Sequence, residues 1–374
     1  MSSSSRLFRY KNPFAIEESN DLFLKAVKEN CEYHYKNCPE YRQILDGEDF
    51  SPDEIKTYDD IKRIPFITTL FFKKHAIFSM PQRKMLIKAT SSGTSGTFSR
   101  VGFDAGALFN LFFMGLHMAK KRGFLSAVPV RYIILGYRPN RNNKAGVAKS
   151  AYSYTFFAPP LRRTYALKYC DGKYVPDFER ILKKLQKYGK SRIPTRFIGF
   201  PAYMFFLLKM LDDNGIHYSL PRRSIILVAG GWKQFYREEV NKEDFYALAK
   251  KVLDIDDDRI IEAYGAVEHP VFYCDCPNHH FHVPVYGRVI IRDVNTLEPV
   301  ENGKKGLISL ITPMNRATPV LNVMTDDIGV LHDASECGCG INSPFFEIKG
   351  RVGLKEIKTC AAGAAEILSG ALKK

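Results

Sequence analysis

Short apolar segments alternate with helical patterns in the middle of the chain, and this alternation constrains the fold more than any other feature. The apolar segments lie at 196–200, 224–228 and 259–264, and Pro201 opens the first of the two helical patterns between them. Proline suits the first turn of a helix because its missing N–H has no partner there. Strands linked by helices at this pitch predict a parallel sheet, and their continuous apolar character indicates burial on both faces.

Beyond residue 283 the pattern of apolar and turn residues changes, and this pattern predicts antiparallel strands. Its short apolar runs are separated by turn residues such as Glu301-Asn302-Gly303 rather than by helical patterns. These strands are predicted at 289–291, 306–311, 320–324, 329–331 and 345–348. We therefore expect an α/β core with an N-terminal helical segment over 1–285, a smaller β-rich subdomain over 286–352 and a short C-terminal segment over 353–374.

Length and composition place the chain among ordinary globular proteins. Its 374 residues are 45% hydrophobic and 25% charged, which is enough for two or three subdomains with a large core. No apolar run reaches the length of a membrane span, and the first residues lack the apolar stretch of a signal peptide, so a cytoplasmic protein is expected. A net charge of +15 favours anionic partners such as nucleotides, but no nucleic-acid-binding module is recognisable.

A run of small polar residues over 90–100, Thr-Ser-Ser-Gly-Thr-Ser-Gly-Thr-Phe-Ser-Arg, lies between two strand-like segments. Its first eight residues offer no apolar side chain that a core could use. Gly93 and Gly96 allow the backbone to approach a ligand closely, and successive N–H groups and hydroxyls would form a concave anion site. The alternative is a flexible Ser/Gly linker. No Gly-Lys-Ser/Thr follows at Walker spacing, so we interpret the stretch as another kind of phosphate loop.

Four later motifs carry residues that suit a nucleotide. The Gly230-Gly231 pair would let a flat ring lie on the backbone, and Tyr264 could stack on a purine. Glu268 could hold Mg²⁺ beside a triphosphate. An aspartate of Thr325-Asp326-Asp327 could accept hydrogen bonds from ribose hydroxyls, and Arg351 suits phosphate or ribose. Taken singly, each motif also fits a plain turn or a surface residue.

The order of these motifs resembles that of the nucleotide-site motifs in the adenylate-forming superfamily of acyl- and aryl-CoA ligases. The resemblance covers about residues 50–360 and implies an adenylate-forming N-terminal-domain fold that uses ATP and Mg²⁺. It implies that Glu268 binds Mg²⁺, Asp327 holds the ribose and Arg351 contacts ribose or phosphate. The implied ATP-binding residues are Ser91, Ser92, Gly93, Thr94, Ser95, Gly96, Thr97, Arg100, Gly230, Gly231, Tyr264, Gly265 and Asp327.

Three departures from that pattern bear on the site. Phe98-Ser99-Arg100 stands where the family usually has Pro-Lys-Gly, which leaves the role of Arg100 as the basic member open. Thr-Asp-Asp replaces Thr-Gly-Asp, which leaves the choice between Asp326 and Asp327 open. The chain ends soon after Arg351, so the mobile C-terminal lobe with its catalytic lysine is expected to be lacking.

This truncated form resembles one branch of the superfamily, the acyl-protein synthetases or fatty-acid–protein ligases of bacterial bioluminescence. Segments 281–285 and 289–293 are also similar to that branch, and the segment 356–360, Glu-Ile-Lys-Thr-Cys, resembles its acyl-acceptor segment. The resemblance implies that the acyl group passes to Cys360 and then to an acyl reductase or carrier protein. The alternative is that Cys360 is an incidental thiol.

Eight cysteines without a secretion signal argue against a disulfide framework, and two close pairs suggest a metal instead. Zinc needs four ligands, which two pairs from separate segments can supply. Cys337-Gly338-Cys339-Gly340 resembles half of a pattern found in some phenylacetate-CoA ligase-like enzymes. The other half is open among two cysteines and three histidines, and reduced surface thiols are the alternative. The zinc candidates are Cys274, Cys276, His282, Cys337 and Cys339.

Together these features and the resemblance predict a ligase that activates a carboxylic acid as an acyl-adenylate and transfers the acyl group to a thiol. The resemblance favours a fatty acid, but the 27 Phe and 20 Tyr suit fatty and aryl acids alike. The expected catalytic residues of the ligase are Cys360, Glu268 and Arg351. A phenylacetate-type CoA ligase, in which CoA is the thiol, is the first alternative. A non-catalytic nucleotide- or acyl-binding partner of a larger complex is the second.

Overall fold

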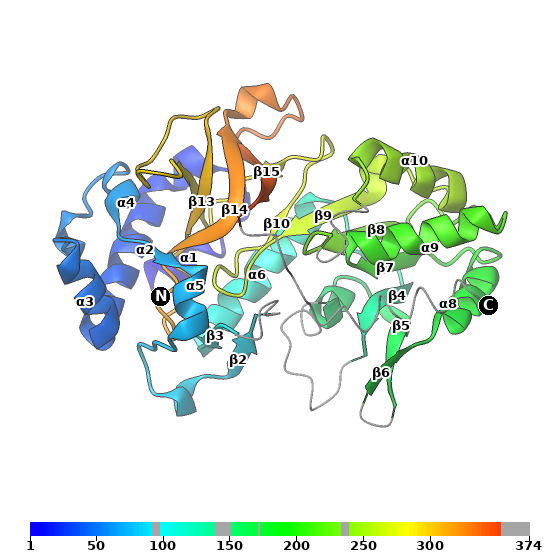
Figure 1. Cartoon of the computed structure of the whole chain (residues 1–374), viewed down its shortest axis with the longest axis horizontal. Coiled ribbons are helices and arrows are strands. Elements are labelled where there is room, and N and C mark those ends of the chain that lie inside the picture. Colours follow the sequence, from blue (N-terminus) through cyan, green and yellow to red (C-terminus); the bar gives the residue numbers. More distant parts are fainter. Residues whose placement is uncertain (92–97, 139–150, 171–172, 233–238, 353–374) are drawn as a thin grey trace. The chain divides into compact units, whose positions relative to one another are not determined.

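The computed structural model describes residues 1–91, 98–138, 151–170, 173–232 and 239–352. Most of the predicted phosphate loop and the whole segment with Cys360 lie outside these residues. The described residues form two compact units, one of residues 1–121 with 265–352 and the other of residues 122–264 (Figure 1). The predicted boundary at 285 follows the change of strand pattern, whereas these units divide the chain after Lys121 and Tyr264. No helix in the described ranges is long and apolar enough to cross a membrane.

The unit of residues 122–264 contains the predicted parallel sheet. Its strands follow the order β9-β8-β7-β4-β5-β6, in which neighbours are parallel except in the β5–β6 hairpin. The bounds of β7, β8 and β9 agree with the predicted strands to within one residue. The strands are β4 (Val130–Tyr137), β5 (Pro160–Cys170), β6 (Lys173–Pro176), β7 (Thr195–Gly199), β8 (Ile225–Ala229) and β9 (Ile260–Tyr264).

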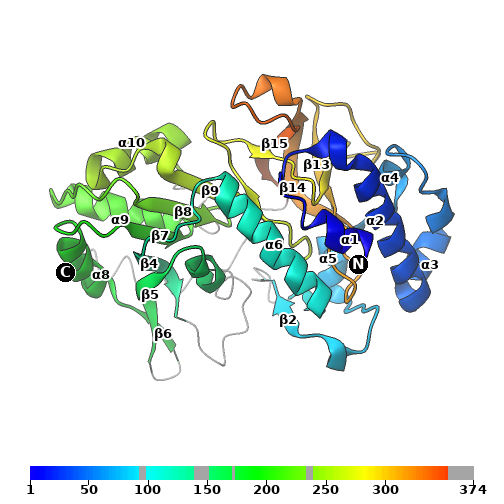
Figure 2. The same ribbon diagram turned by 180° about the vertical axis from the view of Figure 1, so that it is seen from behind.

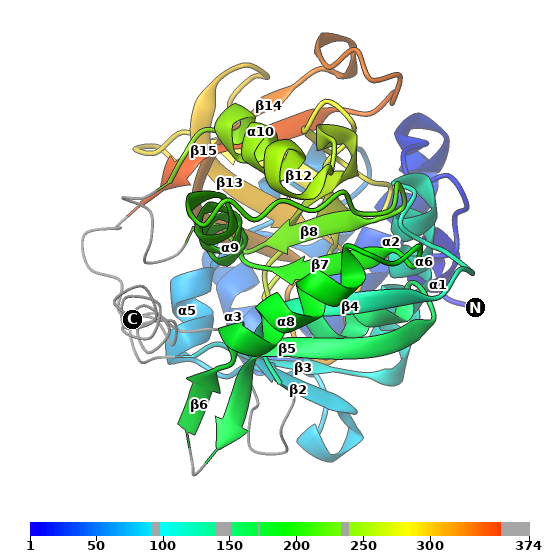
Figure 3. The ribbon, with the colours of Figure 1, turned by 90° about the vertical axis from the view of Figure 1, so that its right-hand side faces the viewer.

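Helices α8 (Phe178–Tyr188), α9 (Pro201–Asp213) and α10 (Lys242–Leu253) cover one face of this sheet (Figure 3). Phe197, Ile226 and Ile260 lie in direct register on neighbouring strands and pack in one buried core with these helices. Pro201 occupies the first turn of α9, as predicted. The Asn241 side chain accepts the Asp244 N–H at 2.7 Å and so caps the start of α10.

The other unit contains the predicted antiparallel sheet. Its order is β11-β15-β14-β13-β12, and β1 extends it by pairing in parallel with β14. The separate strands predicted at 320–324 and 329–331 are parts of one long strand, β14, whose register shifts between them. The strands are β1 (Ile67–Thr68), β11 (Phe281–His282), β12 (Arg288–Arg292), β13 (Lys305–Ile311), β14 (Asn322–His332) and β15 (Phe345–Arg351).

Buried polar side chains from three helices hold the backbone that connects β13 with β14. Ser4 of α1, Asn30 of α2 and Asn110 of α6 donate hydrogen bonds to carbonyls of residues 313–315 (helices in Figure 2). These bonds satisfy carbonyls that are buried away from water. The unit contains α1 (Ser3–Leu7), α2 (Ile16–Asn37), α3 (Pro39–Gly47), α4 (Asp60–Arg63), α5 (Thr69–Lys74), α6 (Ala105–Lys121), the hairpin of β2 (Ile87–Thr90) and β3 (Arg100–Phe103), and the short strand β10 (Tyr273–Cys274).

The same network includes a buried histidine, His34 of α2. Its Nε2 donates to the Asn315 carbonyl at 3.0 Å, so Nδ1 accepts the Ser79 hydroxyl at 2.6 Å and the ring is neutral. Burial lowers the pKa of His34 to about 3. The unfolded chain binds a proton at His34 near pH 6.5, whereas the folded chain binds it only near pH 3. The free energy of unfolding therefore has its full value above pH 6.5 and decreases as the pH falls from 6.5 toward 3.

We therefore expect His34 to make the protein less stable in mild acid. At about pH 5 the free energy of unfolding should be about 2 kcal/mol lower than at neutral pH. Urea unfolding of wild type and His34→Gln at both pH values measures this difference in the free energy of unfolding. In the variant, the free energy of unfolding should differ between the two pH values by about 2 kcal/mol less than in wild type. Equal pH differences in the two proteins would contradict a neutral, buried His34.

Candidate metal centre and nucleotide-binding residues

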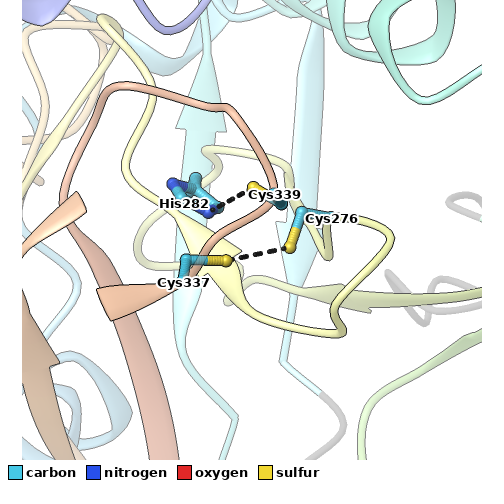
Figure 4. A group of neighbouring side chains, drawn as sticks. All are labelled: Cys276, His282, Cys337 and Cys339. Carbon is cyan, nitrogen blue, oxygen red and sulfur yellow. Dashed lines mark hydrogen bonds between the residues drawn. The ribbon is translucent and has the colours of Figure 1, made fainter. Parts of the chain in front are cut away.

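Three cysteines and one histidine from separate segments converge beside the edge strand β11 (Figure 4). Cys276 follows β10, His282 lies in β11, and Cys337 and Cys339 lie in the loop that leads into β15. Their ligand atoms all lie within 4.8 Å of one another. The Sγ atoms of Cys276 and Cys337 are 3.5 Å apart, and Cys339 Sγ lies 3.2 Å from His282 Nε2. Three sulfurs and one imidazole nitrogen form a donor set that binds zinc in structural sites.

The surrounding backbone orients these ligands. His282 donates from Nδ1 to the Ser343 carbonyl at 2.7 Å, which leaves Nε2 to face a cation. Gly338 and Gly340 have φ angles of 70° and 81°, in the left-handed region that favours glycine. The Cys-Gly-Cys-Gly segment therefore makes a tight turn that a chain with larger residues would resist.

The chemistry of the group follows from its burial. Burial raises the pKa of the Cys337 thiol to about 12, so the thiol is neutral until a bound metal ion displaces its proton. Because protein side chains supply all four donors, a zinc ion here would have a structural role. Cys274, the other predicted candidate, is buried in β10 but is not a member of the group.

Two consecutive aspartates, Asp326 and Asp327, both contact Arg351. Neighbours along a strand usually point to opposite faces. Arg351 Nη2 nevertheless donates to Asp326 Oδ2 at 3.3 Å, and its Nε lies 3.6 Å from Asp327 Oδ1. The register of β14 shifts against β13 between Met324 and Ile328, and against β15 between Ile328 and Gly329. Such a bulge re-aims the side chains near it. The structure therefore brings the predicted Asp327 and Arg351 together.

Helix α5 adds two residues to this group that the sequence analysis missed. Thr69 Oγ1 donates to Asp326 Oδ1 at 3.1 Å, and Lys73 Nζ lies 3.7 Å from Asp326 Oδ2. No motif marks them, because they come from a distant part of the chain. They reach β14 through its pairing with β1, which is only two residues long and has no readable pattern.

Glu268, the predicted Mg²⁺ ligand, lies in a tight loop and is 4% exposed. Ala266 and His269 close the loop with reciprocal backbone hydrogen bonds of 3.3 and 3.2 Å. His269 is buried, stacks on Tyr273 and lies 3.0 Å from its hydroxyl oxygen. Among the described residues, the Glu268 carboxylate has no hydrogen-bond or ion-pair partner. A nearly buried carboxylate without a protein counter-charge suits a divalent cation.

The predicted phosphate loop begins and ends in the β2–β3 hairpin. Ser91 Oγ accepts the Ser99 N–H at 3.0 Å, and the exposed Arg100 pairs with Thr90 at the start of β3. The predicted residues Ser92, Gly93, Thr94, Ser95, Gly96 and Thr97 lie outside the described residues.

The predicted adenine-binding residues follow two neighbouring parallel strands. Ala229 of β8 lies opposite Ala263 of β9, so Gly230 and Tyr264 lie side by side where these strands end. Gly230 and Gly231 have φ angles of 85° and 66°, which agrees with a need for glycine at both positions. The carboxyl ends of parallel strands are where open α/β sheets bind ligands. Gly265, the next predicted residue, opens the Glu268 loop.

Comparison with known proteins relates these features to a family. The family model "Acyl-protein synthetase, LuxE" matches residues 4–369. The chain is 26% identical over 367 residues to a long-chain-fatty-acid–luciferin-component ligase of Aliivibrio fischeri, and the match covers 96% of this chain and 92% of that protein. It is 24% identical over 326 residues to a phenylacetate-coenzyme A ligase of Aromatoleum evansii, covering 83% of this chain and 66% of that protein.

The fold is similar to that of a solved 2-hydroxyisobutyryl-CoA ligase in an open conformation, in complex with 2-HIB-AMP and CoA. The TM-score is 0.68 at 14% identity, and the match covers 92% of this chain and 77% of that structure. This likeness confirms the predicted adenylate-forming fold. Because the family model spans nearly the whole sequence, the chain belongs to the acyl-protein synthetase (LuxE) family, as the sequence predicted, and is an acyl-adenylate-forming ligase.

Proposed function

We propose that this protein adenylates a long-chain fatty acid and passes the acyl group to its own Cys360, and from there to a partner protein such as an acyl reductase or carrier. The observation that carries the proposal is the match along nearly the whole chain to a long-chain-fatty-acid–luciferin-component ligase. The contact of Asp327 with Arg351 and the glycine turn beside Tyr264 support nucleotide binding.

In the first step, a carboxylate oxygen of the fatty acid attacks the α-phosphorus of ATP, and pyrophosphate leaves. Asp327 would accept hydrogen bonds from the ribose hydroxyls, and Arg351 would contact ribose or phosphate. Glu268 would hold Mg²⁺, which when bound neutralises charge on the phosphates. The product is an acyl-adenylate, a mixed anhydride that water would hydrolyse.

In the second step, the Cys360 thiolate attacks the acyl carbonyl carbon of the adenylate. A carbon–sulfur bond forms, the carbon–oxygen bond to AMP breaks, and AMP leaves. A tethered thiol has a high effective concentration, which favours this transfer over hydrolysis. The thiol proton goes to solvent or a base before the attack.

Cys276, His282, Cys337 and Cys339 would bind one structural zinc ion in the same proposal. Two of these ligands lie in the loop between β14 and β15, and His282 lies in β11, which pairs with β15. Zinc would therefore fix the start of the strand that ends at Arg351. CoA as the acyl acceptor is the alternative, favoured by the more distant match to a phenylacetate-coenzyme A ligase.

The decisive experiment separates adenylation from transfer in the full chain. Long-chain fatty acids should stimulate ATP–pyrophosphate exchange more than aryl acids do. Cys360→Ser should keep this exchange but lose hydroxylamine-sensitive labelling by radioactive fatty acid, because no thioester can form. Cys170→Ser is the matched control and should keep both activities.

Two outcomes would contradict the proposal at different points. Labelling of Cys360→Ser at the wild-type level would exclude self-acylation at this thiol and favour CoA or a partner's thiol. Exchange that no acid stimulates would exclude adenylation and favour a non-catalytic nucleotide- or acyl-binding protein.

A further inference from the structure

Asp326 of β14 contacts side chains of two other elements, α5 and β15. Thr69 Oγ1 donates to one of its carboxylate oxygens at 3.1 Å. The other oxygen lies 3.7 Å from Lys73 Nζ and accepts a hydrogen bond from Arg351 Nη2 at 3.3 Å. Thr69 and Lys73 are one helical turn apart on α5, so both side chains reach the same carboxylate.

The helix that carries Lys73 is firmly placed against β14. Thr68 of β1 lies opposite Met324, and its side chain also caps α5 by accepting the Phe71 N–H at 3.1 Å. Thr69 is buried, and the Lys73 side chain is only 15% exposed. Lys73 is therefore not a flexible surface lysine, and its contact with Asp326 is partly shielded from water and salt.

Lys73 gives Asp326 a positive charge in addition to that of the Arg351 guanidinium. Asp326 and Asp327 carry two negative charges, and Arg351 supplies one positive charge to both of them. Without Lys73, Asp326 would compete with Asp327 for the guanidinium. With Lys73 present, Arg351 can turn toward a nucleotide while Asp326 stays neutralised.

We propose that Lys73, supported by Thr69, is a positioning residue of the nucleotide site. It holds Asp326 as a fixed support, so that Asp327 and Arg351 face the ribose together. This inference rests on the proposed function, in which Asp327 accepts hydrogen bonds from the ribose hydroxyls. It also decides between the two aspartates, because it assigns Asp326 to support and Asp327 to ribose.

The test compares ATP with 2′-deoxy-ATP and 3′-deoxy-ATP in pyrophosphate exchange by the full chain. In Lys73→Met, the KM for ATP should rise about tenfold, the effect of losing one interaction of a charged group. The preference for ATP over the deoxy analogues should fall in the same variant, because misplaced side chains would bind the ribose hydroxyls less tightly. Thr69→Val should shift both values in the same direction, and Lys73→Arg should restore them. Lys74→Met, at the next and exposed position of α5, should leave both unchanged.

Asp327→Asn separates failure of the inference from failure of its premise. If Asp327→Asn weakens the preference for ATP but Lys73→Met behaves like Lys74→Met, the role of Lys73 is wrong and the proposed function stands. If Asp327→Asn leaves the preference unchanged, the ribose assignment is wrong and the inference falls with it. Should Lys73→Met fail to fold, judged by circular dichroism, Thr69→Val decides, and an unchanged preference there would overturn the proposal.

Discussion

Replacing Cys337 with serine is expected to abolish binding of one zinc ion per chain and to lower the melting temperature by about 10 °C. Cys337 Sγ lies 3.5 Å from Cys276 Sγ in a group with two further donors, so its loss leaves three of four ligands. Loss of a metal centre costs about 4 kcal/mol or more, and each kcal/mol shifts the melting temperature by about 2–4 °C in a domain of this size. Elemental analysis of untagged protein purified without added metal, followed by calorimetry, measures both effects.

Two other cysteines provide the controls for this prediction. Cys274→Ala should keep its zinc, because Cys274 is outside the group of four donors, and Cys170→Ser should keep both zinc and stability. Zinc that is absent from wild-type protein of full activity would contradict the metal centre. Zinc lost from Cys274→Ala and retained in Cys337→Ser would assign the ligands differently.

The parallel sheet was predictable from sequence because its signals are local. Each of β7, β8 and β9 is a short apolar run followed by turn residues, and Pro201 marks a helix start without reference to the rest of the fold. The long strand β14 was predicted as two strands, since the polar residues of its bulge interrupt the apolar pattern. Only the pairing of β14 with β13 and β15 shows that the strand continues through Asp326 and Asp327.

The candidate site was predictable where its residues form motifs and not where the fold alone assembles it. Paired spacing identified the cysteine segments, but the choice of Cys276 over Cys274 depends on how β10 and β11 lie beside the loop that carries Cys337. His282 differs from its neighbours in its place in the fold, because His279 contacts Asp275 and, of the described histidines, only His282 joins the three cysteines in a group whose ligand atoms all lie within 4.8 Å of one another. Lys73 has no sequence signal at all, because its contact with Asp326 exists only through the pairing of β1 with β14.

The second large effect is expected from Glu268→Gln, which should lower ATP–pyrophosphate exchange about 100-fold. Glutamine keeps the shape of the side chain but removes its charge. Glu268 is nearly buried in a loop closed by the Ala266 and His269 backbones, so another carboxylate cannot easily take its place. A metal ligand that stabilises the transition state by about 3 kcal/mol accounts for a change of about 100-fold in the exchange rate.

The dependence of the exchange rate on Mg²⁺ concentration distinguishes loss of a metal ligand from general damage. In Glu268→Gln, the Mg²⁺ concentration that gives half the maximal rate should rise, and excess Mg²⁺ should restore part of the rate. Glu243→Gln, on the exposed side of α10, is the matched control and should behave as wild type at every concentration. A variant at Glu268 with wild-type exchange at limiting Mg²⁺ would remove this carboxylate from the site, while the Asp327–Arg351 contact would still support nucleotide binding.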